Sequence, residues 1–478
     1  MINTFNQPFT IDFNSIQKEV IDLSKQNFDR QTEEKLSRNL KSRHVMMIAI
    51  GGAIGTGLFL ASGISIKSAG PSVILTYIIA GVFVFFMMRS LGEVLMSDLS
   101  KHSFIDFIEK YLGKNFAFVI GWTYWLCFIA QAMTDLTASG IYIKYWIPNF
   151  PQWIPPLIIL LILIIINMIN VGAFGELESG LSFIKVLAII ALIIIGIVLL
   201  LVHKKIGNTV VSLTNLTKYH GFFPHGFSGF WASFQMVILA YTGIEMVGLT
   251  AGETKYPEKD IPKAINSLPL RIGLFYVGSM IALMIIFPWN KISTSSSPFV
   301  QAFKAIGIPN AASILNIVVI VATISATNSA LFSMSRSLYS LSKLGNAPKT
   351  FSKLSSKAIP NNALHVSSLI LFIIVILNYL MPGKIFTIIT SIASINFLFV
   401  WVAIMFCHYK YKQVTKKRNA LSFPGYKLID IITLILFIGM IITVLVIDST
   451  RIATILSFVW LVILYVISRW KQVKEKVS

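Results

Sequence analysis

The sequence predicts an all-α membrane protein with twelve transmembrane helices, arranged as a five-plus-five inverted repeat followed by two extra helices. Three observations lead to this fold class: an apolar composition, a series of apolar runs of bilayer-spanning length, and two glycine-containing interruptions in those runs. The chain has 478 residues, of which 55% are hydrophobic and 13% are charged. Soluble domains contain about 25% charged residues. The composition therefore predicts a polytopic membrane protein and argues against a soluble enzyme.

The apolar runs divide into twelve spans when about 20 residues are allowed for each crossing. We place them near residues 44–66, 72–95, 117–146, 154–172, 182–203, 231–251, 271–289, 310–342, 365–381, 385–408, 428–447 and 452–470. Residues 1–42 are expected to form a cytoplasmic arm, 43–470 the transmembrane domain, and 471–478 a cytoplasmic tail.

The formal charge of +20 reflects membrane topology. With the N-terminus inside, 31 of the 40 Lys and Arg residues fall on the cytoplasmic side, notably in the Lys410–Lys427 loop. This is the positive-inside bias of a protein whose two termini are both cytoplasmic. The charge therefore needs no nucleic-acid partner, and the lipid bilayer is the predicted surrounding.

The first span contains the stretch Gly51–Phe59, with four glycines in seven residues. Glycine weakens a helix, and a break in lipid releases backbone groups that need partners. Freed amides at the start of the outer half-helix would face an anion, and freed carbonyls would face a cation. A zwitterion such as an amino acid fits this pair of helix ends.

The sixth span contains the second interruption, where Gly243 and Gly248 flank Glu245. The two broken spans each open a block of five helices. Because five is odd, the second block enters the membrane from the opposite side, which is the pattern of an inverted repeat. We assign the first repeat to 43–203, the second to 231–408, and the extra helices to 428–470.

Several short motifs stand out along the chain: Leu40–His44, Gly51–Phe59, Met88–Glu93, Gly121–Cys127, Ala251–Ile265, Ile265–Arg271, Ser325–Ser329 and Asp448–Arg451. Together they resemble the amino-acid permease family of the amino acid–polyamine–organocation superfamily, and within it the D-serine/D-alanine/glycine transporters. The resemblance implies a LeuT-type fold and a proton-coupled secondary transporter that imports small neutral amino acids across the cell membrane by alternating access. A permease of this fold for cationic, aromatic or proline substrates, and an amino-acid-sensing receptor, are the alternatives.

The substrate site is predicted between the two breaks. Backbone amides of Gly55, Thr56 and Gly57 are expected to bind the substrate carboxylate, although small residues packing against a neighbouring helix give the same pattern. The amino group and side-chain wall are assigned to Ala53, Tyr241, Thr242 and Gly243, with packing as the alternative role for Tyr241. Gln131, where the family usually has a small or hydroxyl residue, and Asn328 complete the predicted pocket, with a polar contact between two helices as the alternative role for Asn328.

Ionisable residues inside spans are costly and usually functional. Asp135, Lys185 and Glu245 are the candidates for proton coupling. The resemblance implies that the Lys185 ammonium takes the place of a bound cation between the first and fifth helices, whereas a lysine extended to the membrane interface is the alternative. For Glu93 we favour a structural ion pair, with Arg89 nearby in sequence. We find no metal-ligand spacing, cofactor motif or catalytic constellation, so no metal, cofactor or enzyme activity is predicted.

Overall fold

The computed structural model describes residues 47, 54–101, 103–168, 171–250, 254–415 and 417–477. Ten helices in these ranges are long and apolar enough to cross a membrane. The chain is therefore a multi-pass helical membrane protein. The predicted arm 1–42 and the first part of the first break, including Ala53, lie outside the described residues.

The long helices follow the predicted apolar runs. They are α5 (Val73–Leu95), α7 (Lys114–Ile143), α9 (Val171–Leu201), α17 (Ala311–Lys343), α18 (Asn361–Leu380), α19 (Ile385–Val414), α20 (Tyr426–Val446) and α21 (Asp448–Val477). Helix α8 (Ile154–Asn167) has 14 residues, which is short for a crossing that takes about 20. The count of twelve spans stays a prediction, because the first span is only partly described and α8 is short.

Three apolar stretches consist of several short helices. They are α3 (Thr56–Phe59) with α4 (Ala61–Ala69); α10 (Gly226–Ala232), α11 (Phe234–Tyr241), a 3-10 turn (Ile244–Met246) and α12 (Val247–Thr250); and α13 (Pro257–Asn266), α14 (Leu268–Arg271), a π-helical segment (Ile272–Gly278) and α15 (Ser279–Ile286). The first two stretches contain the predicted breaks. The π-helical segment of the third was not predicted.

Short elements connect the spans. Helix α6 (Phe104–Leu112) begins with a capping box, in which Ser103 accepts from the Ile105 amide and Asp106 accepts from the Ser103 amide. Helix α16 (Pro298–Ile306) has proline at its first position. Strands β1 (Lys205–Ile206) and β2 (Thr209–Val210) form an antiparallel pair, the only strands in the described part of the chain. Further 3-10 turns are Gly70–Ser72, Leu213–Leu216, Trp289–Lys291 and Lys349–Ser352.

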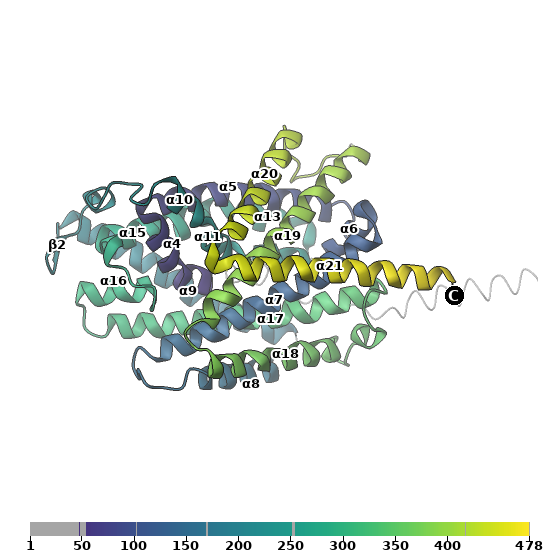
Figure 1. Ribbon diagram of the computed structural model, residues 1–478, viewed down its shortest axis with the longest axis horizontal. Coiled ribbons are helices and arrows are strands. Elements are labelled where there is room, and N and C mark those ends of the chain that lie inside the picture. Colours follow the sequence, from purple (N-terminus) through teal and green to yellow (C-terminus); the bar gives the residue numbers. More distant parts are fainter. Residues whose placement is uncertain are drawn as a thin grey trace, which may run out of the picture.

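Helix α7 lies at the centre of the bundle. It packs against α17, α19, α6, α8 and α21, and Figure 1 shows α7 and α17 side by side. In the most apolar 18-residue stretch of α7, 78% of the residues are buried, and the share is the same in α19. In α9 and α21 the buried share of the corresponding stretch is only 28%. Helices α7 and α19 thus belong to the core, and α9 and α21 expose apolar side chains at its periphery.

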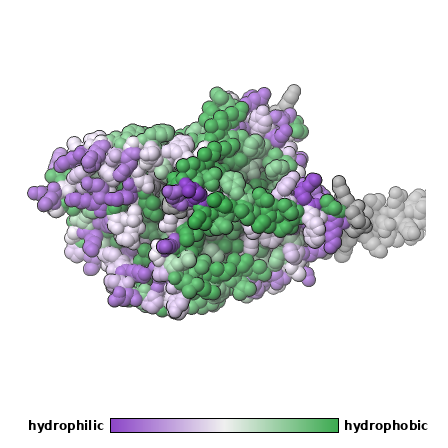
Figure 2. Space-filling model, viewed as in Figure 1, coloured by the Kyte–Doolittle hydropathy of each residue, from purple (hydrophilic) through white to green (hydrophobic). Residues whose placement is uncertain are grey.

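The outer surface has the polarity expected of a bilayer-embedded protein. Figure 2 shows apolar side chains covering the middle of the molecule, with hydrophilic residues gathered toward its two ends. Exposed residues such as Ile435 on α20 and Val462 on α21 contribute to the apolar belt, since their side chains are 66% and 61% exposed. Such a belt would be unfavourable in water and is stable in lipid.

Candidate functional site

The described part of the first break begins as extended chain. Gly55 has φ −132° and ψ −152°, and α3 begins at Thr56. The amides of Leu58 and Phe59 both donate to the Gly55 carbonyl at 3.1 Å. The Thr56 amide instead donates to Oδ1 of Asp135 on α7, at 3.4 Å. The Thr56 amide at the start of α3 therefore has the carboxyl group of Asp135 as its partner in this structure, and binding of a substrate carboxylate at this helix start stays a prediction.

Gly55 and Gly57 face different neighbours. A Cβ on Gly55 would lie 3.2 Å from the Ala326 Cβ and 3.6 Å from the Asp135 Oδ1. A Cβ on Gly57 would lie 2.6 Å from the Cα of Ala240 and from the Leu239 carbonyl, both backbone atoms of α11. Gly57 thus allows the two broken spans to touch, which is the packing role open to it from the sequence, whereas Gly55 borders α7 and α17.

The second break follows α11 directly. Thr242 is extended, with φ −62° and ψ 148°, and Gly243 is left-handed at φ 90°. A residue with a Cβ is strained at that φ, which explains the glycine. Glu245 turns back on the break: its Oε1 accepts from the Gly243 amide and its Oε2 from the Trp401 indole, both at 3.3 Å. The carboxyl group thereby caps the start of the turn Ile244–Met246, which follows the break.

Two residues on α7 join the breaks. The Thr242 hydroxyl donates to Oε1 of Gln131 at 2.8 Å, and Nε2 of Gln131 donates to Oδ2 of Asp135 at 3.0 Å. Asp135 then accepts from Thr56 on the first break. All four residues are buried. A continuous polar path therefore runs from one broken span to the other through residues predicted for the site.

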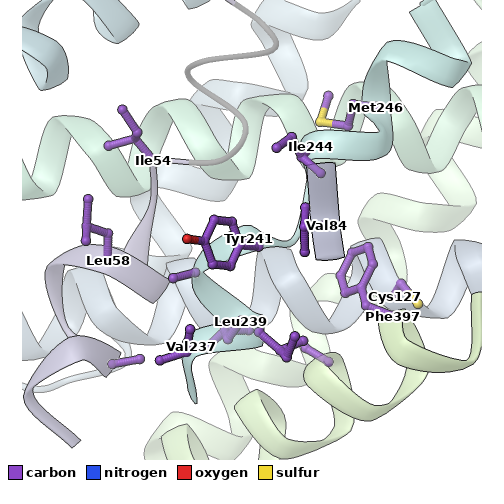
Figure 3. Packing of buried hydrophobic residues seen from close by; sticks show 14 of the residues in the cluster. Ile54, Leu58, Val84, Cys127, Val237, Leu239, Tyr241, Ile244, Met246 and Phe397 are labelled. Atoms are coloured by element: carbon purple, nitrogen blue, oxygen red, sulfur yellow. The ribbon is translucent and has the colours of Figure 1, made fainter. Parts of the chain in front are cut away.

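Tyr241 points away from this path. Its hydroxyl donates to the Tyr77 carbonyl on α5 at 2.8 Å, and its ring lies 4.7 Å from the Tyr276 ring centroid. In the view of Figure 3 the ring lies between Leu58 of α3 and Val84 of α5. This geometry is that of a packing aromatic with a satisfied hydroxyl, which was the alternative role.

Lys185 lies in a second polar group. Its Nζ donates to the Ser325 hydroxyl at 2.9 Å, and that hydroxyl donates to Oε1 of Glu178 at 2.6 Å. Nζ lies 3.9 Å from the same Glu178 oxygen, with both side chains fully buried. The ammonium is thus enclosed between α9 and α17 and does not extend to an interface. A Coulombic interaction also connects Lys185 with Asp135.

Glu178 was not predicted as a site residue, because it precedes the apolar run 182–203 predicted as a span. The helix begins earlier, at Val171, so Glu178 lies inside it. Glu178, Ser182 and Lys185 are four and three residues apart, the spacing that puts side chains on one helix face. Ser182 donates to the Glu178 carboxylate at 3.2 Å. That spacing is the signal that would have identified Glu178.

Asn328 and Glu93 are held outside the path between the breaks. The Asn328 side-chain oxygen accepts from Asn167 of α8 at 2.8 Å, which connects α17 with α8. Glu93 forms an ion pair with Lys412 of α19 at 2.7 Å, so the structural ion pair favoured for Glu93 is present, with Lys412 and not the neighbouring Arg89 as its partner. Arg89 instead donates to the Leu421 and Ser422 carbonyls. Glu93 and Lys412 are distant in sequence, and only the packing of α5 against α19 brings them together.

Comparison with known proteins finds amino-acid permeases and transporters along nearly the whole chain. A family model described as amino acid permease matches residues 44–477. Amino-acid permease AapA of Bacillus subtilis (strain 168) is 51% identical over 447 residues, covering 93% of this chain and 96% of that protein. The D-serine/D-alanine/glycine transporter of Escherichia coli (strain K12) is 40% identical over 90% of this chain and 93% of its own. DL-alanine permease SerP2 of Lactococcus lactis subsp. cremoris (strain MG1363) is 38% identical, with coverages of 94% and 98%.

Proposed function

The chain belongs to the amino acid permease family, and from this premise we propose that it imports small neutral amino acids together with protons. Glycine, alanine, D-alanine and D-serine are the proposed substrates. Relatives named for D-serine, D-alanine and glycine, and for DL-alanine, support this substrate class. The protein would lie in the cell membrane with both termini cytoplasmic. Its twelve spans would form two inverted five-helix repeats, 43–203 and 231–408, followed by the helices of 428–470.

The contact between Asp135 and the Thr56 amide is the observation that carries the proposal. The start of α3 is the proposed binding place of the substrate carboxylate, with Gly55, Thr56 and Gly57 supplying the amides. A substrate carboxylate arriving there meets the Asp135 carboxyl group. Two carboxylates cannot share a small buried site while both are ionised. Proton binding to Asp135 removes the repulsion, so substrate and proton would each favour the binding of the other.

Lys185 would couple the protonation of Asp135 to the packing of the surrounding helices. Its ammonium interacts with Glu178 and with Asp135. When Asp135 gains a proton, Lys185 loses part of its attraction toward the first break and its interaction with Glu178 becomes the dominant one. The ion pair thus has two arrangements, which an alternating-access cycle requires. Glu245, held at the second break, is the remaining candidate for proton coupling.

Transport by the purified full chain tests the proposal. The protein is reconstituted in vesicles and supplied with labelled glycine, L-alanine, D-alanine, D-serine or lysine, with and without an inside-alkaline pH gradient. We expect the gradient to drive accumulation of the four small amino acids and lysine to be excluded. Lysine uptake equal to that of glycine would contradict the substrate class, and accumulation that ignores the gradient would contradict proton coupling.

A further inference from the structure

A buried cluster of ionisable groups joins the ends of α5, α19 and α20, away from the two breaks. His408 of α19 lies between two carboxyl groups: its Nδ1 is 2.7 Å from Oδ2 of Asp430 on α20, and its Nε2 is 3.2 Å from Oε2 of Glu93 on α5. All three side chains are fully buried. The cluster shares no residue with the group around Lys185.

The number of protons in this cluster follows from its geometry. A neutral imidazole has one N–H and one lone pair, and an ionised carboxylate only accepts. Both ring nitrogens of His408 are within hydrogen-bond distance of a carboxyl oxygen. A neutral imidazole between two ionised carboxylates can form only one of these hydrogen bonds. Forming both of them requires one additional proton. The proton belongs either to an imidazolium or to one of the carboxyl groups.

We propose that Glu93, His408 and Asp430 form a second proton-binding site, which connects α5 to α19 and α20 and is separate from Lys185. With its proton, the cluster of Glu93, His408, Asp430 and Lys412 is electrically neutral, counting an imidazolium and an ammonium against two carboxylates. Without it, the cluster carries an unbalanced buried negative charge, which is costly.

Loss of the proton weakens one contact more than the other. Glu93 has further partners at Oε1, where Lys412 donates at 2.7 Å and Ser422 at 2.6 Å. Asp430 has one further partner, the Ser90 hydroxyl, at 3.4 Å. The remaining ring proton is therefore held on Nδ1, toward Asp430, and the Nε2 lone pair faces Glu93. Deprotonation thus removes the hydrogen bond from His408 to Glu93 of α5 and keeps the one from His408 to Asp430 of α20, while Lys412 remains the link between α19 and α5.

Other groups near the imidazole set its surroundings. The Phe423 ring stacks on it at 5.8 Å and in turn faces the Arg89 guanidinium at 5.9 Å. Tyr426 of α20 and Tyr411 of α19 lie with their rings 6.0 and 6.4 Å from it, and Tyr111 of α6 contacts Tyr411. None of these neighbouring side chains carries a carboxyl or imidazole group, the kinds of group that ordinarily titrate nearest to neutral pH. The Glu93, His408 and Asp430 cluster is therefore the part of this region that exchanges a proton in that interval.

The segment between α19 and α20 packs against the end of α5 that carries Glu93. Asn419 donates to the Glu93 carbonyl at 2.9 Å, and Arg89 donates to the carbonyls of Leu421 and Ser422 at 3.1 and 3.3 Å. The segment belongs to the Lys410–Lys427 loop, which is proposed to be cytoplasmic. The site would then exchange its proton with the cytoplasm and respond to internal pH.

Thermal unfolding of the purified full chain tests the proton site without reference to transport. Because the folded cluster holds a proton that the unfolded chain releases at neutral pH, stability falls as the pH rises, with the unfolding equilibrium changing by up to about tenfold per pH unit. We expect the Tm to fall between pH 6 and 8 by more in the wild type than in His408→Gln. His365→Gln, a change at an exposed histidine of α18, is the matched control and keeps the wild-type slope. Equal slopes in wild type and His408→Gln overturn the proton site.

A second variant fixes the protonated arrangement. In Asp430→Asn the amide donates to Nδ1, so that Nε2 of a neutral imidazole carries the proton and donates to Glu93 at every pH. We expect this variant to lack the extra fall of Tm between pH 6 and 8. If His408→Gln does not fold, Asp430→Asn tests the same point. A fall of Tm between pH 6 and 8 as large in Asp430→Asn as in the wild type contradicts the proposal.

Exchange of glycine across vesicles then tests the link to transport, which rests on the proposed function. Since a hydrogen bond to a charged group is worth about tenfold in an equilibrium constant, the protonated link holds α5 and α19 in the arrangement described above. We expect internal pH 6 to slow exchange, relative to pH 8, by roughly threefold to tenfold more in the wild type than in His408→Gln, because the variant keeps only the pH dependence of Asp135. In Asp430→Asn we expect the slowing that depends on His408 at both pH values. Comparing Lys185→Met with the double variant Lys185→Met and His408→Gln separates the two sites. If the proposed function is right, Lys185→Met abolishes accumulation, but adding His408→Gln still changes how exchange responds to internal pH. Loss of this effect of His408→Gln in the Lys185→Met background contradicts a separate site.

Discussion

The hydroxyl of Thr242 donates a 2.8 Å hydrogen bond to the side-chain oxygen of Gln131, which connects the second break to the central helix α7. Gln131 passes the connection on to Asp135, and Asp135 to the first break. The two broken spans are therefore coupled through side chains that lie at the predicted substrate site.

Substitutions at the two ends of that hydrogen bond should not have additive effects on substrate binding. We expect Thr242→Val and Gln131→Leu each to weaken glycine binding, and the double variant to weaken it by about 1 kcal/mol less than the sum, since the shared hydrogen bond is lost only once. Calorimetric titration of the four proteins measures the coupling. Strict additivity would mean that the hydrogen bond has no role in binding.

A side chain at Gly55 should block the proposed carboxylate site. Because the φ of Gly55 is negative, the effect is steric and not a matter of backbone strain. Gly55→Val fills the space toward Asp135 and Ala326, and we expect loss of substrate binding in a protein that still inserts and elutes as a single species. Gly55→Ala combined with Ala326→Gly restores the missing space, so it should bind better than Gly55→Ala alone. Normal binding by Gly55→Val would move the anion site elsewhere.

Gly57 should behave differently from Gly55, because its missing Cβ makes room for the backbone of α11. Backbone atoms cannot move aside as a flexible side chain does. We expect Gly57→Ala to lower stability by about 1–3 kcal/mol or more, the usual cost of overpacking. Gly180→Ala, at a helical glycine with open space around its Cα, is the control. Thermal unfolding of both variants gives the comparison, and equal Tm values would contradict the close contact of α3 with α11.

Removal of the Lys185 charge should uncouple transport from the proton gradient. Lys185→Met keeps an apolar stem of similar length, but it leaves Glu178 as an unpaired buried carboxylate, which is destabilising. The double variant Lys185→Met with Glu178→Gln removes both charges and is expected to fold better. In either variant we expect exchange of glycine without accumulation against a gradient, measured in vesicles with an imposed pH difference. Full accumulation would leave Lys185 a structural role and direct attention to Glu245.

Two exposed lysines test the topology. Lys427 is the last residue of the predicted Lys410–Lys427 loop and lies in the first turn of α20, and Lys205 lies in the β1–β2 hairpin on the side predicted to be external. The native cysteines, Cys127 and Cys407, are both buried. An impermeant thiol reagent applied to intact cells should label Lys205→Cys and spare Lys427→Cys until the membrane is opened. The reverse pattern would invert the assigned orientation.

The sequence by itself determined where the membrane helices run and where one of them breaks. Both features are local: a bilayer of fixed thickness needs an apolar run of matching length, and a left-handed φ such as that of Gly243 favours glycine. The motifs that resemble the amino acid permease family also lie in short stretches, and the match of the family model to residues 44–477 confirmed the resemblance.

Only the tertiary structure decided which polar side chains meet. Glu178 joins Ser325 across 147 residues of sequence, and Glu93 joins Lys412 across 319 residues. Tyr241 packs against α5 and does not face the path between the breaks. The reason is physical: a side chain's partners depend on how its helix is rotated and where it crosses its neighbours, and these are set by packing over the whole bundle. When a helix is apolar on every side, its sequence pattern does not indicate which face contacts which neighbour.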